Sequence, residues 1–131
     1  MKVLIDTHTF LWFVAGSMEL SETAKKLIKN KHNSVYISIA SLWEISIKTA
    51  IGKLQITDGY ETVINDVIEN DISIVPINFA HTVMQNKLPF HHRDPFDRII
   101  VSQAIVENMN LISRDGAFDA YLENIEVKRI W

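Results

Sequence analysis

Four acidic residues in this sequence stand where they could share one divalent cation. Asp6 and Asp115 each follow an apolar run typical of a strand, and Glu44 and Asp97 fall in the first turns of expected helices. If they meet at one edge of a sheet, their like charges repel unless a cation lies between them. Carboxylate oxygens, in a chain without cysteine, favour Mg²⁺ or Mn²⁺ over zinc. Such an ion can activate water, so we expect metal-dependent phosphodiester hydrolysis.

The stretch PFHHRDPFDR, residues 89–98, combines a helix start with one of these acids and a further one. Asp94 as N-cap, Pro95 at the first helical position and Asp97 in the first turn are typical of a helix N-terminus, where the dipole favours negative charge. This local role requires no ligand. Asp94 is therefore either a fifth acid at the metal or only the cap that holds Arg93 and the helix start.

Each of the other acids also has a purely structural interpretation. Asp6 could cap the following helix, and Asp115 with its glycine neighbour is an ordinary turn signal. Glu44 could join Ser41 in a capping box, or pair with Lys48 four residues later, which stabilises a helix by only ~0.3 to 0.5 kcal/mol. These alternatives stay open for each acid singly, but the four together favour a shared site.

The remaining polar residues near the acids suit phosphate better than zinc. His91 and His92 are adjacent, and neither they nor His8 has the i, i+4 spacing of a helical zinc pair. We expect these histidines to have a loop role or to contact phosphate. One hydroxyl and four basic side chains lie within a few residues of the acids and are candidate substrate contacts: Thr7, Lys48, Arg93, Arg98 and Arg114.

Composition indicates one domain, residues 1–131, with 47% hydrophobic residues to build a core. The net charge of −3 taken alone argues against a generic polybasic nucleic-acid binder, but four of the 16 acids assigned to a metal leave the rest nearly balanced by 13 bases. The absence of cysteine excludes disulfides. No signal peptide or membrane-spanning run is evident, so we expect a cytoplasmic protein without a membrane partner.

Strand and helix patterns alternate along the chain. This alternation predicts parallel strands with right-handed crossovers, hence a three-layer α/β/α sandwich whose ligands gather at the carboxyl ends of the strands. Strands are expected at 2–5, 35–38, 72–77, 110–113 and 126–130. Helices are expected at 10–15, 21–32, 39–51, 58–70, 78–87, 95–108 and 117–121.

Four segments in this order resemble the PIN-domain family, and within it the VapC-type ribonuclease toxins of toxin–antitoxin pairs: LIDTHTFLW, SIASLWEISIKTAIGKL, HRDPFDRIIVSQA and LISRDGAFDAY. The resemblance covers nearly the whole chain. It implies an α/β/α fold with an acidic pocket that holds Mg²⁺ or Mn²⁺, acting as an endoribonuclease. It further implies a homodimer, and a cognate antitoxin whose C-terminal segment occupies the groove near the site.

Carried over by position, the family's acidic residues correspond to Asp6, Glu44, Asp97 and Asp115, and Asp94 is an extra acid typical of the HRDPFDR branch. None of the four main positions is substituted. A haloacid-dehalogenase-like phosphatase would need a second aspartate at position 8, which is histidine, and a receiver domain would need further acids near the start. A non-catalytic binding module, whose acids receive a basic partner peptide, remains an alternative and predicts no metal dependence.

Overall fold

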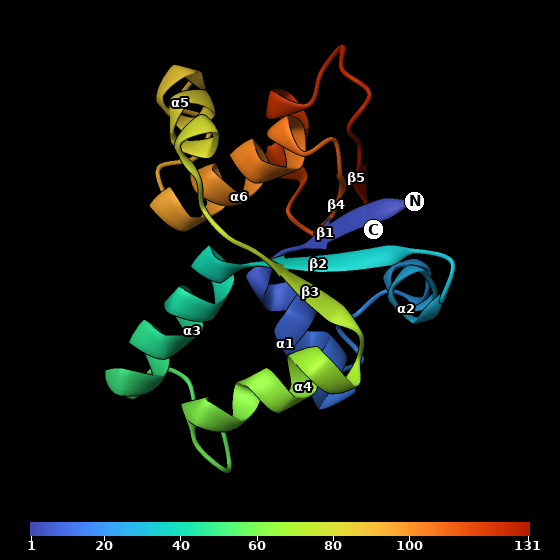
Figure 1. Ribbon diagram of the computed structural model, residues 1–131, viewed down its shortest axis with the longest axis vertical. Helices are drawn as coiled ribbons and strands as arrows, with labels where there is room; N and C mark the ends of the chain where they lie inside the picture. The colour runs from blue at the N-terminus through green and yellow to red at the C-terminus, as the bar shows by residue number, and fades with distance from the viewer.

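Five parallel strands form one sheet in the order β3-β2-β1-β4-β5 in the computed structural model, which describes residues 1–131 (Figure 1). In the register, Ile5 lies opposite Ile37 on one side and Ile112 on the other. The strands are β1 (Lys2–Ile5), β2 (Ser34–Ser38), β3 (Ile72–Val75), β4 (Asn110–Ile112) and β5 (Arg129–Ile130).

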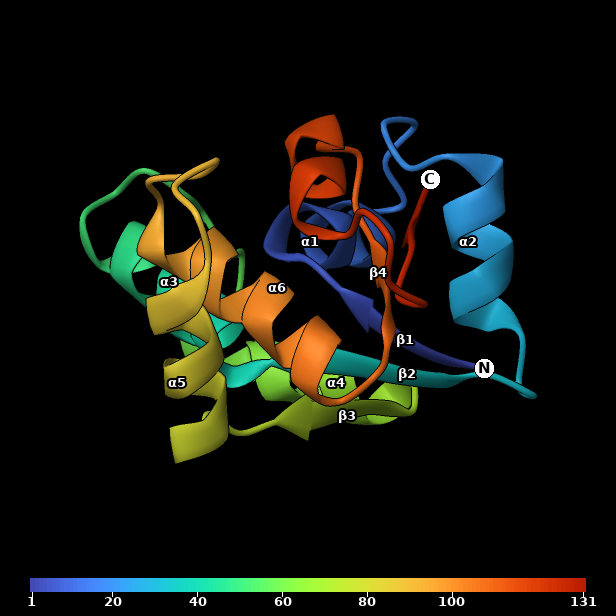
Figure 2. The same ribbon diagram turned by 90° about the horizontal axis from the view of Figure 1, so that it is seen from above.

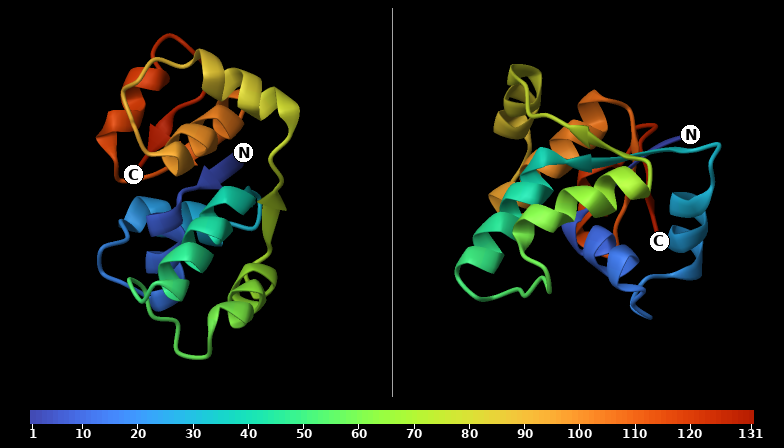
Figure 3. Two further views of the ribbon diagram at one scale, coloured as in Figure 1. Left: turned by 90° about the vertical axis from the view of Figure 1, so that its left-hand side faces the viewer. Right: turned by 60° about the horizontal axis from the view of Figure 1, so that its bottom comes forward.

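Helices cover both faces of this sheet, as the three-layer expectation requires. In Figures 1 and 2, α5 and α6 lie on one side of the sheet and α1 and α4 on the other. The left-hand view of Figure 3 shows the same division from the side. The helices are α1 (Thr7–Ala15), α2 (Glu22–Lys29), α3 (Ile39–Ala50), α4 (Val63–Glu69), α5 (Phe79–Lys87) and α6 (Pro95–Val106), with short 3₁₀ turns η1 (Tyr60–Thr62) and η2 (Gly116–Tyr121). The predicted α/β/α sandwich is confirmed.

The order of the strands reverses between β1 and β4. From β1 the chain moves outward through β2 to β3, and the connection through α5 and α6 then returns it to β4, on the far side of β1. In open α/β sheets, such a switch point leaves a crevice at the carboxyl ends of the two strands, because the flanking connections leave in opposite directions. Asp6 and Asp115 follow these two strand ends.

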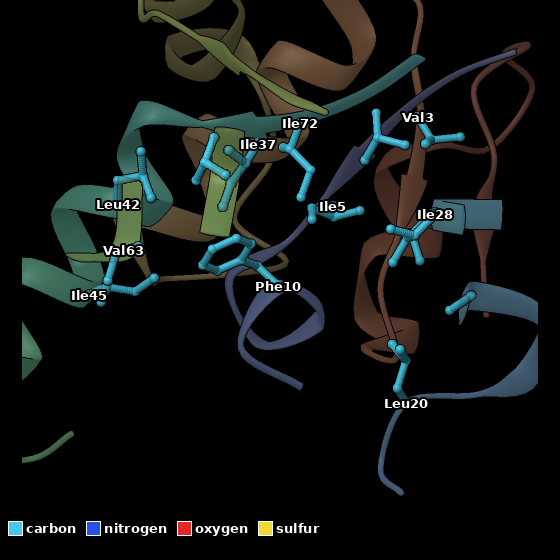
Figure 4. Packing of buried hydrophobic residues seen from close by; sticks show 14 residues of the cluster. Val3, Ile5, Phe10, Leu20, Ile28, Ile37, Leu42, Ile45, Val63 and Ile72 are labelled. Atoms are coloured by element: carbon cyan, nitrogen blue, oxygen red, sulfur yellow. The ribbon is translucent and has the colours of Figure 1, made fainter. Parts of the chain in front are cut away.

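Alternation along the strands divides the core into two clusters. Val3 and Ile5 point into the cluster beneath α1, α2 and α4, whereas Leu4 points into the one that contains α6 and η2. Figure 4 shows the first cluster, with the Phe10 ring among side chains from the sheet, α3 and α4. Phe10 is 1% exposed and so anchors the first turns of α1 beneath the carboxyl end of β1.

Several expected elements differ in extent from the structure. The helix expected at 10–15 begins earlier, at Thr7, the helix expected at 21–32 ends at Lys29, and the strand expected at 72–77 ends at Val75. The helix expected from Asp58 begins only at Val63, because Gly59 adopts φ 91°, which an α-helix does not allow, and a 3₁₀ turn intervenes. The last strand, expected at 126–130, is reduced to Arg129–Ile130. None of the helices has the length and apolar character needed to cross a membrane.

We expect Phe10→Ala to lower the free energy of unfolding by about 3 to 5 kcal/mol, because it leaves a cavity in the cluster under β1. Urea denaturation measures the change. Phe79→Ala is the matched control, since Phe79 is 82% exposed, and should alter stability by no more than about 0.5 kcal/mol. Equal stability of the two variants would contradict this account of the core.

Candidate active site

Asp6 lies at the carboxyl end of β1, and its cap geometry leaves one oxygen available. Its side chain is 7% exposed, and Oδ1 accepts hydrogen bonds from the Thr9 backbone N–H at 2.9 Å and the Thr9 hydroxyl at 2.6 Å. These bonds make Asp6 the N-cap of α1, so the structural interpretation is correct. No hydrogen bond engages Oδ2, so capping and ligand binding are compatible.

Glu44 is buried and held by two neighbours. Its Oε1 accepts a hydrogen bond from the Thr7 hydroxyl at 2.7 Å, and Oε2 lies 2.7 Å from Nζ of Lys48. The i, i+4 pair with Lys48 is therefore present. The capping box with Ser41 is not, because α3 begins at Ile39 with Ser38 as N-cap, which puts Glu44 in the second turn. Thr7 is buried and positions Glu44, rather than facing solvent as a substrate contact would.

The start of α6 has the geometry that PFHHRDPFDR predicts. Asp94 is the N-cap, its Oδ1 accepts from the Phe96 backbone N–H at 2.8 Å, and Pro95 occupies the first position. Asp97 therefore lies in the first turn, with a side chain 29% exposed. Asp115 is likewise an N-cap, that of η2, and accepts from the Ala117 N–H at 3.0 Å. Three of the five candidate acids thus begin helical segments.

Electrostatic repulsion converges on Asp97. Its pKa rises from 3.8 to about 7, first through burial and then through the negative charges of four carboxylates, in decreasing order those of Asp94, Glu44, Asp6 and Asp115. All the acids selected from the sequence are thus close enough to act on one carboxyl. Like charges gathered in this way fit a cation, and oxygen donors of this type are those that Mg²⁺ and Mn²⁺ prefer.

His92 completes the cluster, and the sequence analysis did not assign it to the metal site. Its Nε2 lies 3.4 Å from Oδ2 of Asp115, its Nδ1 lies 3.9 Å from Oδ2 of Asp97, and Nε2 is buried without a hydrogen-bond partner. One donor atom from each of the three residues lies within 4.8 Å of the others. The sequence signal for this placement was the position of His92, two residues before the N-cap Asp94 and therefore near the start of α6.

The candidate basic contacts divide into exposed and buried residues. Arg93 is exposed, and Arg114, with 53% of its side chain exposed, pairs with Glu19 and lies over the Trp12 ring. Arg114 also lines a pocket with Asp6 and Asp115. Lys48 keeps 39% of its side chain exposed beside Glu44. These three bases are available to an anionic substrate.

The position of Arg98 corrects the expectation that this residue contacts phosphate, because it is buried. Its residue is 2% exposed, and its guanidinium donates to the backbone carbonyls of Gln85, Leu88 and Pro89 at 2.8 to 3.1 Å while lying 4.2 Å from the Phe90 ring. It therefore ties the end of α5 and the following loop to α6. Nearness in sequence to two aspartates did not indicate orientation, because this face of α6 turns toward α5.

A model of the PIN domain family matches residues 3–123. The chain belongs to the PIN domain family. Comparison with curated proteins gave no match. The match spans β1 to η2 and so includes all five candidate acids.

Solved structures of toxin–antitoxin proteins have the same fold. VapBC2 from Rickettsia felis, bound to a fragment of promoter DNA, is 18% identical with a TM-score of 0.68, covering 98% of each chain. VapBC-1 from nontypeable Haemophilus influenzae is 16% identical with a TM-score of 0.65, covering 99% of this chain and 97% of the other. VapBC-5 from Mycobacterium tuberculosis is 18% identical with a TM-score of 0.61, covering 98% of each chain.

We expect the stability of the metal-free protein to fall relative to Asp97→Asn as the pH rises from about 4 to 8. Asp97 ionises near 3.8 when unfolded and near 7 when folded, so its stabilising contribution is complete below pH 3.8 and is lost as the pH passes 7. Thermal unfolding of both chains in EDTA measures the difference, and the comparison cancels other titrating groups. Mg²⁺ should raise the melting temperature of the parent more at pH 8 than at pH 6. A constant difference would contradict the repulsion.

We expect Arg98→Met to lower the free energy of unfolding by about 2 to 4 kcal/mol, because buried carbonyls lose their donors. Urea denaturation measures this loss, with exposed Arg93→Met as the control, expected to change stability by no more than about 0.5 kcal/mol. Unchanged stability of Arg98→Met would argue against its role as a loop anchor.

Proposed function

We propose that this PIN domain is a Mg²⁺- or Mn²⁺-dependent endoribonuclease, the toxin of a type II toxin–antitoxin pair. The observation that carries the proposal is the gathering of four carboxylates around Asp97 at the β1/β4 switch point, where burial first and then these negative charges raise its pKa to about 7. A partly buried carboxylate surrounded by like charges destabilises the folded state unless a cation binds beside it. The PIN family membership and the VapBC structures with the same fold give independent support.

Asp6, Glu44, Asp97 and Asp115 are the proposed catalytic residues, and with Asp94 they would hold the ion. A bound Mg²⁺ or Mn²⁺ would lower the pKa of a water for in-line attack and stabilise the charge that develops on the phosphate. The chain's own contribution is to orient the donors. The N-caps aim Asp6 and Asp115 at the crevice, and Thr7 holds Glu44 at a set angle.

Three basic side chains are proposed to guide the RNA backbone to the acids. Lys48, Arg93 and Arg114 are exposed or partly exposed near the cluster, and their charges offset its repulsion of phosphate. Arg98 has no such role, because its donors are used inside the fold. The net reaction adds water across a P–O bond, with the proton from the water going to the leaving oxygen.

A cognate antitoxin and a second copy of the chain are the proposed partners. Among the similar structures, VapBC-5 is a member of the VapBC family of toxin–antitoxin systems, which supports the first. Large apolar side chains are exposed on α3 and on the loop before α6, including Trp43 (60%) and Phe90 (79%), and a protein partner would cover such residues. A toxin that cleaves cellular RNA would work in the cytoplasm.

We expect the purified chain, freed of antitoxin, to cut end-labelled total RNA into discrete fragments in Mg²⁺ and in Mn²⁺ but not in EDTA. Asp97→Asn should reduce cleavage by at least about 100-fold, because it removes a donor that acts in the transition state. Gel analysis of the fragments measures both effects. Arg93→Gln is a graded control and should weaken cleavage without abolishing it.

Two outcomes would separate this proposal from its alternatives. A folded chain that binds RNA or a basic peptide but cuts nothing under any condition would favour a non-catalytic binding module. Release of inorganic phosphate from phosphomonoesters, without cleavage of RNA, would favour a phosphatase. His8 is exposed on α1 and supplies no second carboxylate beside Asp6, so no contact in the site favours the phosphatase.

A further inference from the structure

Beside the acids, one pocket exposes part of an aromatic side chain, that of Trp12, which metal binding does not account for. This open pocket of about 310 Å³ is lined by Asp6 and Asp115 and, beyond them, by His8, Trp12 and Arg114. Trp12 packs against the hydrophobic cluster under β1, yet it is not fully buried, and its accessible part faces the pocket. An aromatic ring with core support on one side and a polar pocket on the other is a fixed platform.

Arg114 and Trp12 form this platform together. The guanidinium carbon of Arg114 lies 4.5 Å from the centroid of the Trp12 ring, and more than half of its side chain is exposed. Trp131 packs edge-on against the Trp12 ring, with ring centroids 5.9 Å apart. His8 lies one helical turn before Trp12, and their ring centroids are 5.5 Å apart. Planar groups prearranged in this way cost little conformational entropy when another ring stacks on them.

A second hollow continues from the same two residues of α1. It has a volume of about 600 Å³, shares His8 and Trp12 with the first pocket, and adds Lys48 and Lys53 together with Asp58 and Asp66. A strand of nucleic acid leaving the acids along this path would therefore meet planar groups first and the two lysine side chains next. This order matches single-strand binding sites, where aromatic side chains stack bases and basic side chains follow the backbone.

We propose that an unpaired base next to the cleaved phosphate stacks on the Trp12–Arg114 platform, which makes these two residues determinants of substrate specificity. The inference rests on the proposed ribonuclease function and names its substrate form, single-stranded RNA. Bases in a duplex have both faces covered by their neighbours, so the platform selects against paired RNA. Arg114 then contributes its guanidinium plane as well as its charge, a distinction that Lys does not reproduce.

Equilibrium binding tests the platform with two fluorescein-labelled 12-nucleotide probes, oligoadenylate RNA and an abasic ribose–phosphate strand of the same charge. The full-length chain carries Asp97→Asn, so that the RNA stays intact in Mg²⁺. We expect this chain to bind oligoadenylate at least about tenfold more tightly than the abasic strand, since base stacking on aromatic side chains contributes much of the affinity in such sites.

Four substitutions in that background separate stacking from charge and from folding. Trp12→Leu keeps apolar packing and should lower the affinity for oligoadenylate to that for the abasic strand. Trp12→Phe should retain most of the difference between the two affinities. Arg114→Lys leaves the charge in place at an exposed position and should also lose preference for bases. Phe79→Leu, which removes an exposed aromatic ring outside both hollows, should change neither affinity.

The outcomes distinguish this inference from the ribonuclease proposal. Loss of base-dependent affinity in Trp12→Leu and Arg114→Lys, with abasic binding unchanged, supports the platform. If the parent cuts RNA, but Trp12→Leu in the Asp97→Asn chain leaves the affinity for both probes unchanged, the platform proposal is overturned and the ribonuclease proposal is not. Absence of cleavage by the parent, together with absence of binding to either probe, overturns both.

Discussion

Repulsion among carboxylates at the β1/β4 switch point is the constraint on which the rest of the site depends. Most of these acids are stabilised individually by the fold. Asp6, Asp94 and Asp115 are N-caps whose oxygens accept backbone hydrogen bonds, and Glu44 has Lys48 beside it. Asp97 accepts no such bond, and its pKa is raised first by burial and then by the negative charges of the whole group. The strain is concentrated on one carboxyl that a cation would relieve.

Capping and the proposed metal binding are compatible roles in this protein. An N-cap uses one carboxylate oxygen and fixes the torsion of the side chain, so the second oxygen is held in place for a ligand. Asp6 illustrates this, with Oδ1 bonded to Thr9 and Oδ2 without a hydrogen bond. Helix starts at the carboxyl ends of two neighbouring strands thereby aim several oxygens at one point. The predicted cap roles of Asp6, Asp94 and Asp115 are confirmed, and they are compatible with the shared site proposed above.

The loop before α6 is held in place by a buried arginine side chain, that of Arg98. Arg98 bonds carbonyls of this loop and of the end of α5, while the Tyr121 hydroxyl accepts the His92 N–H at 2.7 Å. These contacts hold His92 between Asp97 and Asp115. The two arginines that flank DPFD thus differ in their surroundings: Arg93 is exposed to solvent, whereas Arg98 is buried inside the fold.

The sequence by itself determined the alternating elements, the parallel sheet and the acids at strand and helix ends, because these follow from hydrophobic period, cap residues and strand-end rules that act over a few residues. It could not determine that Arg98 turns inward while His92 joins the acids. Those outcomes depend on which faces of α5, α6 and η2 pack together. Only the tertiary structure decides them, since the orientation of a side chain is set by neighbours distant in the chain.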